Sequence, residues 1–200
     1  MQCDMWFPTP IWSVMLNIDN SNVYSYCKQE KIKDNGRQVS NDGGWQSNNI
    51  DEVTSVPELS ELVNQIFFYS SAALDCYNYD STNRMLKIIN MWVNINDDKH
   101  SYNKQHNHSG STISGVYYVK GNENSGQIRF PRPSLEDYII QSTGRVKETN
   151  QFTYSEAGYT PEEGKLLLFP SYVPHYVETN QTNDERISIA FNIGFYDNEK

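Results

Sequence analysis

Apolar residues with helical spacing mark the first part of the chain. Over residues 20–33, Val23, Tyr26 and Cys27 share one face, and Asn35-Gly36 then supplies a signal for a helix end. Ahead of this segment, residues 7–16 carry two prolines and then a short apolar run, which predicts a strand. The chain is therefore expected to begin with a short strand followed by an amphipathic helix.

A second helix is predicted from about residue 55. Ser55 and Glu58 have the spacing of a capping box, and Pro57 is tolerated in a first turn because its missing N–H would be unpaired there in any case. The apolar residues that follow have helical spacing: Leu59, Leu62, Val63, Ile66 and Phe67. We expect this stripe to cover the outside of a sheet.

From about residue 85 the pattern changes to short β-rich segments separated by turn residues. These segments are Met85–Asn96, Ser111–Lys120, Gln127–Pro131, Lys165–Pro170, Tyr172–Glu178 and Glu185–Phe195. Residues 121–126 read as a turn, and the polar residues 134–156 as a loop over a site. Many short strands after few helices predict a mainly β fold with flanking helices, a β-sandwich or jelly roll. We expect one domain over residues 1–200, with the strand and helices in 1–84 and the β core in 85–200.

Composition narrows the classes of partner. The 200 residues include 25 acidic and 16 basic ones, for a net charge of −9, which disfavours general nucleic-acid binding. No apolar run approaches the roughly 18 residues of a membrane span, so no membrane partner is expected. The three cysteines show no CxxC pattern, and the first residues lack a basic signal-peptide region, which together favour a cytoplasmic protein with reduced thiols. An exposed edge strand would allow a homodimer.

The histidines supply the first candidate chemistry. His106 and His108 flank one residue just before a predicted strand, and in extended chain such residues point the same way. His175 lies beyond an apolar strand, directly after Pro174. The three are candidate metal ligands, and the alternative is surface imidazoles in polar loops.

A second candidate lies in the last predicted strand, where Ile187, Ile189, Phe191 and Ile193 share one face. Arg186 and Ser188 lie on the other face. If that face points inward, an Arg and a Ser there would be costly unless they held a ligand, and an Arg fork matches a carboxylate. If the face is solvated, as is common in antiparallel sheets, the pair is unremarkable.

Taken together, these segments resemble the iron(II)- and 2-oxoglutarate-dependent oxygenases, in which His-x-(Asp/Glu), a distal His and Arg-x-Ser recur. The resemblance is to a branch, found in bacteria and phages, with His-x-His in place of His-x-Asp. The segments that carry it are 7–10, 44–47, 91–96, His106-Asn107-His108-Ser109, 113–119, 169–171, Pro174-His175 and 186–193.

The resemblance implies a double-stranded β-helix with the N-terminal helices packed on one sheet. It implies iron(II) held by His106 and His175, with His108 in the carboxylate position. It further implies that Arg186 and Ser188 bind the distal carboxylate of the cosubstrate 2-oxoglutarate, and that Tyr118 also reaches it.

The missing carboxylate leaves alternatives open. A third neutral ligand would leave the site one unit more positive, or a carboxylate such as Asp98 or Glu123 would complete it instead. A cupin-like metal dioxygenase without 2-oxoglutarate and a non-catalytic β-helix binding module are the alternative functions. The expected function is a hydroxylase of a protein side chain or a small organic molecule, with Trp45 and Trp92 as candidates for the pocket wall or the core.

Overall fold

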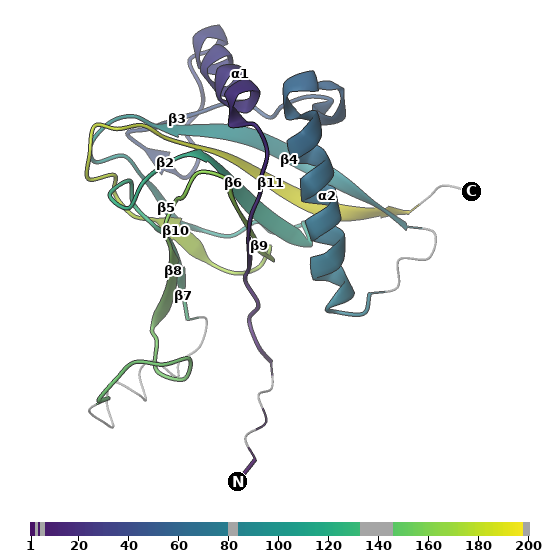
Figure 1. Cartoon of the computed structure of the whole chain (residues 1–200), viewed down its shortest axis with the longest axis vertical. Coiled ribbons are helices and arrows are strands. Elements are labelled where there is room, and N and C mark those ends of the chain that lie inside the picture. The colour runs from purple at the N-terminus through teal and green to yellow at the C-terminus, as the bar shows by residue number, and fades with distance from the viewer. Residues whose placement is uncertain (3, 5–6, 80–83, 133–145, 198–200) are drawn as a thin grey trace.

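Two antiparallel sheets build the protein in the computed structural model, which describes residues 1–2, 4, 7–79, 84–132 and 146–197. The larger sheet has the strand order β1-β9-β6-β11-β4-β3 and the smaller one β2-β5-β10-β7-β8 (Figure 1). In the larger sheet the strands are β1 (Trp12–Met15), β9 (Lys165–Pro170), β6 (Ile113–Lys120), β11 (Arg186–Asp197), β4 (Arg84–Asn96) and β3 (Trp45–Gln46). In the smaller they are β2 (Asn41–Asp42), β5 (Tyr102–His106), β10 (His175–Val177), β7 (Ile128–Pro131) and β8 (Glu156–Tyr159).

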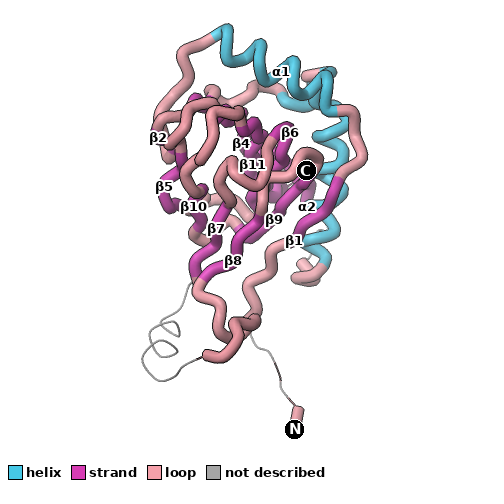
Figure 2. The backbone as a smooth tube through the Cα atoms, turned by 60° about the vertical axis from the view of Figure 1, so that its left-hand side comes forward, coloured by secondary structure: helices cyan, strands magenta, loops and turns pink. Residues whose placement is uncertain are grey.

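Helices α1 (Asn20–Lys33) and α2 (Ser60–Asp75) lie against the larger sheet, as the two views in Figures 1 and 2 agree. Their buried apolar residues form one cluster with the outward faces of β11, β6 and β4, which includes Ile187, Ile189 and Phe191. This arrangement confirms the predicted packing of the helices on one sheet. The strand β1 pairs with β9, so the N-terminal part of the chain also extends the larger sheet.

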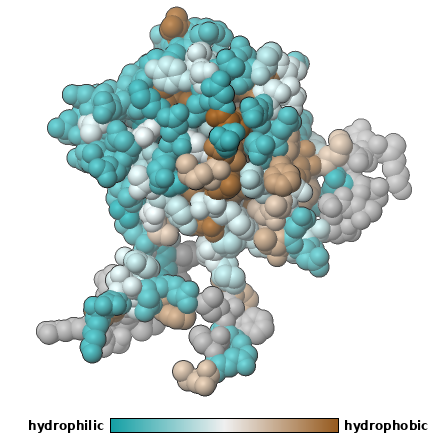
Figure 3. Space-filling model, in the orientation of Figure 1, coloured by the Kyte–Doolittle hydropathy of each residue, from teal (hydrophilic) through white to brown (hydrophobic). Residues whose placement is uncertain are grey.

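A second apolar cluster lies on the inner side of the larger sheet. It is made of Val116 and Tyr118 on β6, Leu167 and Phe169 on β9, Ile128 and Phe130 on β7, and Val173. Alternate residues of β6 and β9 therefore serve two cores, one under the helices and one between the sheets, as expected of strands buried on both faces. Hydrophilic side chains cover much of the surface, with apolar ones gathering beside α2, where Phe68 is 66% exposed (Figure 3).

The start of α2 differs from the sequence prediction. Residues Val53–Ser55 and Pro57–Leu59 form two 3₁₀ turns, and the α-helix begins only at Ser60 without a side-chain cap. The prediction that Ser55 and Glu58 form a capping box is therefore wrong. The residue before Pro57, Val56, is held in an extended conformation, which is the usual effect of a following proline and separates Ser55 from the helix.

Strand prediction failed where the segments are polar. The strands β2, β3, β5 and β8 were not predicted, because a segment such as Tyr102–His106 has no apolar alternation, and β10 is shorter than the predicted segment Tyr172–Glu178. Within the described residues, no helix has the length and apolar character needed to cross a membrane. The larger share of the loop predicted over residues 134–156 lies outside the described residues, while 150–153 form a turn.

Gly115 tests how tightly the larger sheet packs. A Cβ there would lie 2.3 Å from Cζ of Phe191 and 2.8 Å from the backbone oxygen of Leu167. We expect Gly115→Ala to lower the free energy of unfolding by about 1–3 kcal/mol, measured by urea denaturation, because the surrounding backbone cannot yield cheaply. Ile32→Ala, at a side chain 84% exposed, is the control and should change it by less than about 0.5 kcal/mol. Equal effects of the two would contradict this packing.

Candidate metal centre and cosubstrate cavity

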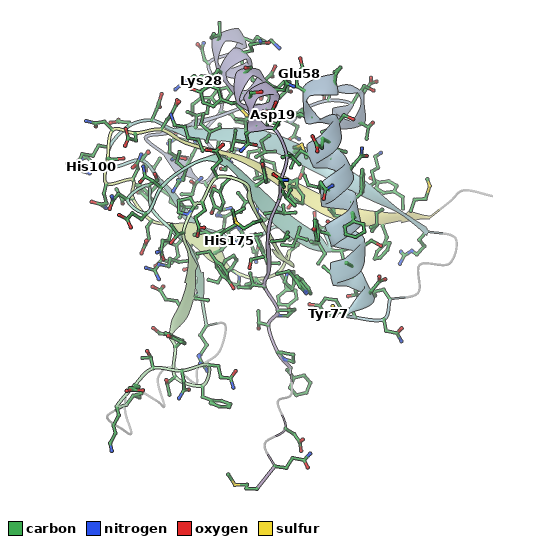
Figure 4. The ribbon with its side chains drawn as sticks, in the orientation of Figure 1. Asp19, Lys28, Glu58, Tyr77, His100 and His175 are labelled. Carbon is green, nitrogen blue, oxygen red and sulfur yellow. The ribbon has the colours of Figure 1, made fainter. Side chains whose placement is uncertain are left out.

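Three histidines converge between the sheets. His106 ends β5 and His175 begins β10, and the two are paired opposite one another across these antiparallel strands. His108 follows two residues later, where its backbone N–H donates to the carbonyl of Ser171 at 2.9 Å. One ligand atom from each imidazole lies within 4.8 Å of the others. Figure 4 shows His175 in the interior and His100, the fourth histidine, far from it at the left edge.

Two of the imidazoles are held by the backbone. Nδ1 of His106 donates to the carbonyl of Lys104 at 2.7 Å, and Nδ1 of His175 donates to that of Val173 at 3.1 Å. A carbonyl can only accept, so each ring carries its proton on Nδ1 and leaves the Nε2 lone pair free. Such a hydrogen bond from the second nitrogen is how proteins orient histidine ligands. The arrangement suits a divalent metal ion.

Burial keeps the three rings neutral. It lowers the pKa of His106 below its usual range, the pKa of His108 to about 4 and that of His175 to about 3, and the neighbouring imidazoles act in the same direction on the last two. A histidine must be neutral to bind a metal ion. At neutral pH all three rings already meet this condition, so none has to lose a proton first.

Arg186 lies at the other end of the same cavity. Its side chain is buried, and Nη1 donates to the carbonyls of Ser125 at 2.7 Å and Gly126 at 2.9 Å. Burial lowers the pKa of Arg186 to about 10, so the group stays charged at neutral pH. Among the described residues, no carboxylate lies within ion-pair distance of it, and Nε and Nη2 make no hydrogen bond. A buried cation without an acid partner is a site for an anion.

The turn that holds Arg186 depends on Gly126. This residue has a φ of +82°, and a Cβ there would lie 2.2 Å from the backbone oxygen of Glu178. Only glycine meets both conditions without strain. The turn predicted over residues 121–126 thus both reverses the chain and supplies two carbonyl groups that accept hydrogen bonds from the guanidinium.

Further polar groups face this cavity beside Arg186. In the sheet register Ser188 stands between Tyr118 on β6 and Asn94 on β4, and all three line the cavity. Burial raises the pKa of Tyr118 well above its usual range, so its hydroxyl remains a neutral donor. Neither this hydroxyl nor that of Ser188 bonds to another described residue, and the buried Oδ1 of Asn94 has no partner. These groups fit a small anionic ligand that carries further oxygens.

All six residues singled out in the sequence line one cavity: His106, His108, His175, Tyr118, Arg186 and Ser188. The face of β11 that carries Arg186 is thus interior, and its reading as a solvated face is wrong because the second sheet covers it. Trp92 lines the cavity, whereas Trp45 packs against the core under the helices. Asn94 and Asn103 were missed, since a single Asn in a strand carries no distinctive pattern.

The proposed carboxylate alternatives for the third ligand do not join the cluster. Asp98 and Glu123 both lie exposed in turns, and among the described residues the grouping of possible metal ligands here contains three histidines and no acid. The turns that carry these acids lie outside the strand pair that brings the histidines together. The structure therefore favours His108 over either carboxylate as the third group.

We expect the metal-free protein to lose stability as the pH falls from about 6.5 to about 5. The unfolded chain binds protons on its imidazoles near pH 6.5, whereas His108 and His175 resist protonation until about 4 and about 3 when folded. The unfolded state then holds more protons, so the free energy of unfolding decreases as the pH falls through this window. Urea denaturation across this window measures the slope. His108→Asn should make it shallower and His100→Asn should not; equal slopes in all three proteins would contradict the neutral cluster.

Solved structures resemble this fold. A prolyl-4-hydroxylase from Pseudomonas putida is 14% identical, with 92% of each chain covered and a TM-score of 0.58. HygX from Streptomyces hygroscopicus, with nickel and 2-oxoglutarate bound, is 13% identical, with 93% of this chain and 83% of that one covered and a TM-score of 0.56. The epimerase SnoN from nogalamycin biosynthesis, described as alpha ketoglutarate dependent, is 14% identical, with 94% and 79% covered and a TM-score of 0.60. These matches show a double-stranded β-helix.

The sequence comparisons concern the same region. No curated protein sequence matches the chain. Residues 90–192, more than half of the chain, match a family model described as "Putative 2OG-Fe(II) oxygenase". That stretch runs from β4 to β11 and includes all the residues that line the cavity except one, Ser40. The chain therefore belongs to the 2OG-Fe(II) oxygenase family, and it is an enzyme that uses iron(II) and 2-oxoglutarate.

Proposed function

We propose that this oxygenase hydroxylates a C–H bond of a protein side chain or a small organic molecule. The observation that carries the proposal is one cavity with three neutral imidazoles at one end and, at the other, a buried guanidinium that has no carboxylate partner among the described residues. The first suits a metal ion and the second suits the far carboxylate of a dicarboxylic keto acid. The family match favours this reading over the cupin-like dioxygenase and the non-catalytic module considered from the sequence.

His106, His108 and His175 would hold the iron, and their spacing on one side would leave positions for a chelating keto acid and for O₂. Iron(II) so bound supplies the oxidising chemistry, in which one oxygen atom enters the substrate C–H bond and the other enters succinate as CO₂ is released. Arg186 and Ser188 would fix the distal carboxylate of 2-oxoglutarate, and Tyr118 would donate to it as a neutral phenol. The apolar walls, such as Phe169 and Val116, would keep water from the reacting groups.

The carbonyl groups of Ser125 and Gly126, which accept hydrogen bonds from Nη1, orient Arg186 for the cosubstrate. They occupy one edge of the guanidinium of Arg186 and leave Nε and Nη2 for the cosubstrate. They also fix the side chain before the ligand arrives, so little rotamer entropy is lost on binding. Lysine cannot replace it, because an ammonium group lacks the planar fork.

Anaerobic addition of iron(II) and then 2-oxoglutarate should produce the weak visible charge-transfer band of a chelated keto acid. His175→Ala should abolish the band, and Arg186→Lys should raise the 2-oxoglutarate concentration at half-maximal intensity roughly 10- to 100-fold. Arg129→Lys is the matched control, because Arg129 pairs with Glu178 outside the cavity and lysine can keep that pair. Iron binding with no band on addition of 2-oxoglutarate would overturn the proposal.

His108 is expected to be the third iron ligand. Removing a residue that only hydrogen-bonds to a metal ligand lowers metal affinity roughly 10- to 100-fold. His108→Ala removes a ligand itself, so it should weaken iron(II) binding by at least that factor. His100→Ala is the matched control, because that exposed imidazole lies outside the cluster. Calorimetric titration with iron(II) under anaerobic conditions measures both. Unchanged affinity in His108→Ala would mean that this imidazole is not a ligand.

A further inference from the structure

A second cleft adjoins the outer side of the histidine cluster. It measures about 460 Å³, within the range of roughly 300–1,000 Å³ of small-molecule sites, and it shares His106 and His108 with the inner cavity. Five side-chain amides line it: Gln46, Asn90, Gln105, Asn107 and Asn192. A molecule in this cleft would therefore lie against two of the proposed iron ligands, where a reacting C–H bond has to be.

The lining of the cleft carries almost no net charge. Lys104 is its one cationic residue among those described, and its Nζ lies 3.2 Å from the carboxylate of Asp42. An anionic or cationic ligand would lose hydration here without gaining an opposite charge, so the cleft favours an uncharged ligand.

A chain of hydrogen bonds that runs from buried serines to a partly buried amide orients two of the cleft's amides. Oγ of Ser114 donates to Oδ1 of Asn192 at 2.6 Å, so its 2.8 Å bond to Oγ of Ser171 is one that it accepts. Nδ2 of Asn192 then donates to Oδ1 of Asn90 at 2.5 Å. Each of these three bonds then pairs a donor with an acceptor, and Nδ2 of Asn90 has no hydrogen-bond partner among the described residues. A ligand with an oxygen acceptor can therefore accept a hydrogen bond from Asn90.

Trp92 adds an apolar surface to this polar wall. It lies on β4 beside the imidazole of His108, with ring centroids 5.7 Å apart, and it lines both the cleft and the inner cavity. The amides can both donate and accept hydrogen bonds, and the indole offers an apolar surface beside them. These properties suit a ligand with hydroxyl groups around a ring that exposes C–H bonds on its faces. A sugar ring has this combination, since its hydroxyls both donate and accept and its C–H face packs on indole.

We propose that the cleft is the substrate subsite and that it binds a neutral polyhydroxylated molecule of the glycoside class, with Asn90 donating to one of its oxygens. This rests on the proposed function, because it takes the imidazoles to mark the position of the metal. The link from Asn90 through Asn192 and Ser114 to Ser171 also ties the subsite to the carbonyl that holds the backbone of His108. Asn90 and Asn192 are thus specificity residues.

The test uses the full chain loaded with iron(II) and 2-oxoglutarate without O₂. Its probes are methyl glycosides and neutral disaccharides, with glucuronic acid, glucosamine and a proline-containing peptide as the charged and peptidic alternatives. Binding is read from Trp92-dependent changes in fluorescence and from calorimetry, and the charge-transfer band reports separately on metal and cosubstrate. In air, consumption of 2-oxoglutarate reports turnover.

The informative variant is Asn90→Asp, which keeps the oxygen that Asn192 donates to but replaces the free donor with a negatively charged acceptor. It should retain the charge-transfer band and weaken binding of the neutral glycoside roughly 10- to 100-fold. Asn90→Ala, which removes the donor without adding charge, should weaken binding in the same direction. Asn35→Asp, the same change at an exposed residue beyond α1, should leave it unaltered.

The outcomes separate the two proposals. A missing charge-transfer band in the parent protein would overturn the proposed function itself. A normal band with binding of the peptide or of a charged sugar, and not of any neutral glycoside, would overturn only the substrate class. Equal glycoside affinity in the parent protein and Asn90→Asp would overturn the role of Asn90.

Discussion

The buried charge of Arg186 is the constraint on which much of this structure depends. Removing a guanidinium from water costs several kcal/mol unless polar partners replace the lost hydration. Here two carbonyls of the 121–126 turn replace part of it, and within the described residues no acid supplies the rest. The turn needs glycine at position 126, and the strand β11 has to place position 186 inside the barrel. In the function proposed above, the distal carboxylate of 2-oxoglutarate meets the remaining demand for negative charge.

The opposite end of the cavity follows a different physical logic. The candidate metal site is assembled from imidazoles that burial keeps neutral, and two of them are oriented by backbone carbonyls two residues earlier in the chain. If His108 is the third ligand, as proposed above, these three ligands do not neutralise any charge of the metal. On that proposal, the charge of the metal would be balanced mainly by the cosubstrate, a dianion, and the occupancy of the two ends of the cavity would be coupled.

Several features could be predicted from the sequence because they depend on local pattern. The alternation in residues 186–193 correctly placed Ile187 and Ile189 on one face of β11 and Arg186 and Ser188 on the other. The helix over residues 20–33 was also correct. The failures were of two kinds: the capping box at Ser55 gave way to 3₁₀ turns, and the polar strand β5 had no apolar alternation to reveal it.

By itself, the sequence determined the two helices, the apolar strands, the two faces of β11 and the residue types available for metal and carboxylate binding, because periodicity and spacing are local properties of the chain. Only the tertiary structure decided that positions 106 and 175, far apart in the chain, pair across β5 and β10, and that the face bearing Arg186 is interior. It also decided the amide cleft, whose residues come from four separate segments. Such sites arise from strand pairing between distant segments, and burial and hydrogen-bond direction are set by the neighbours that this pairing supplies.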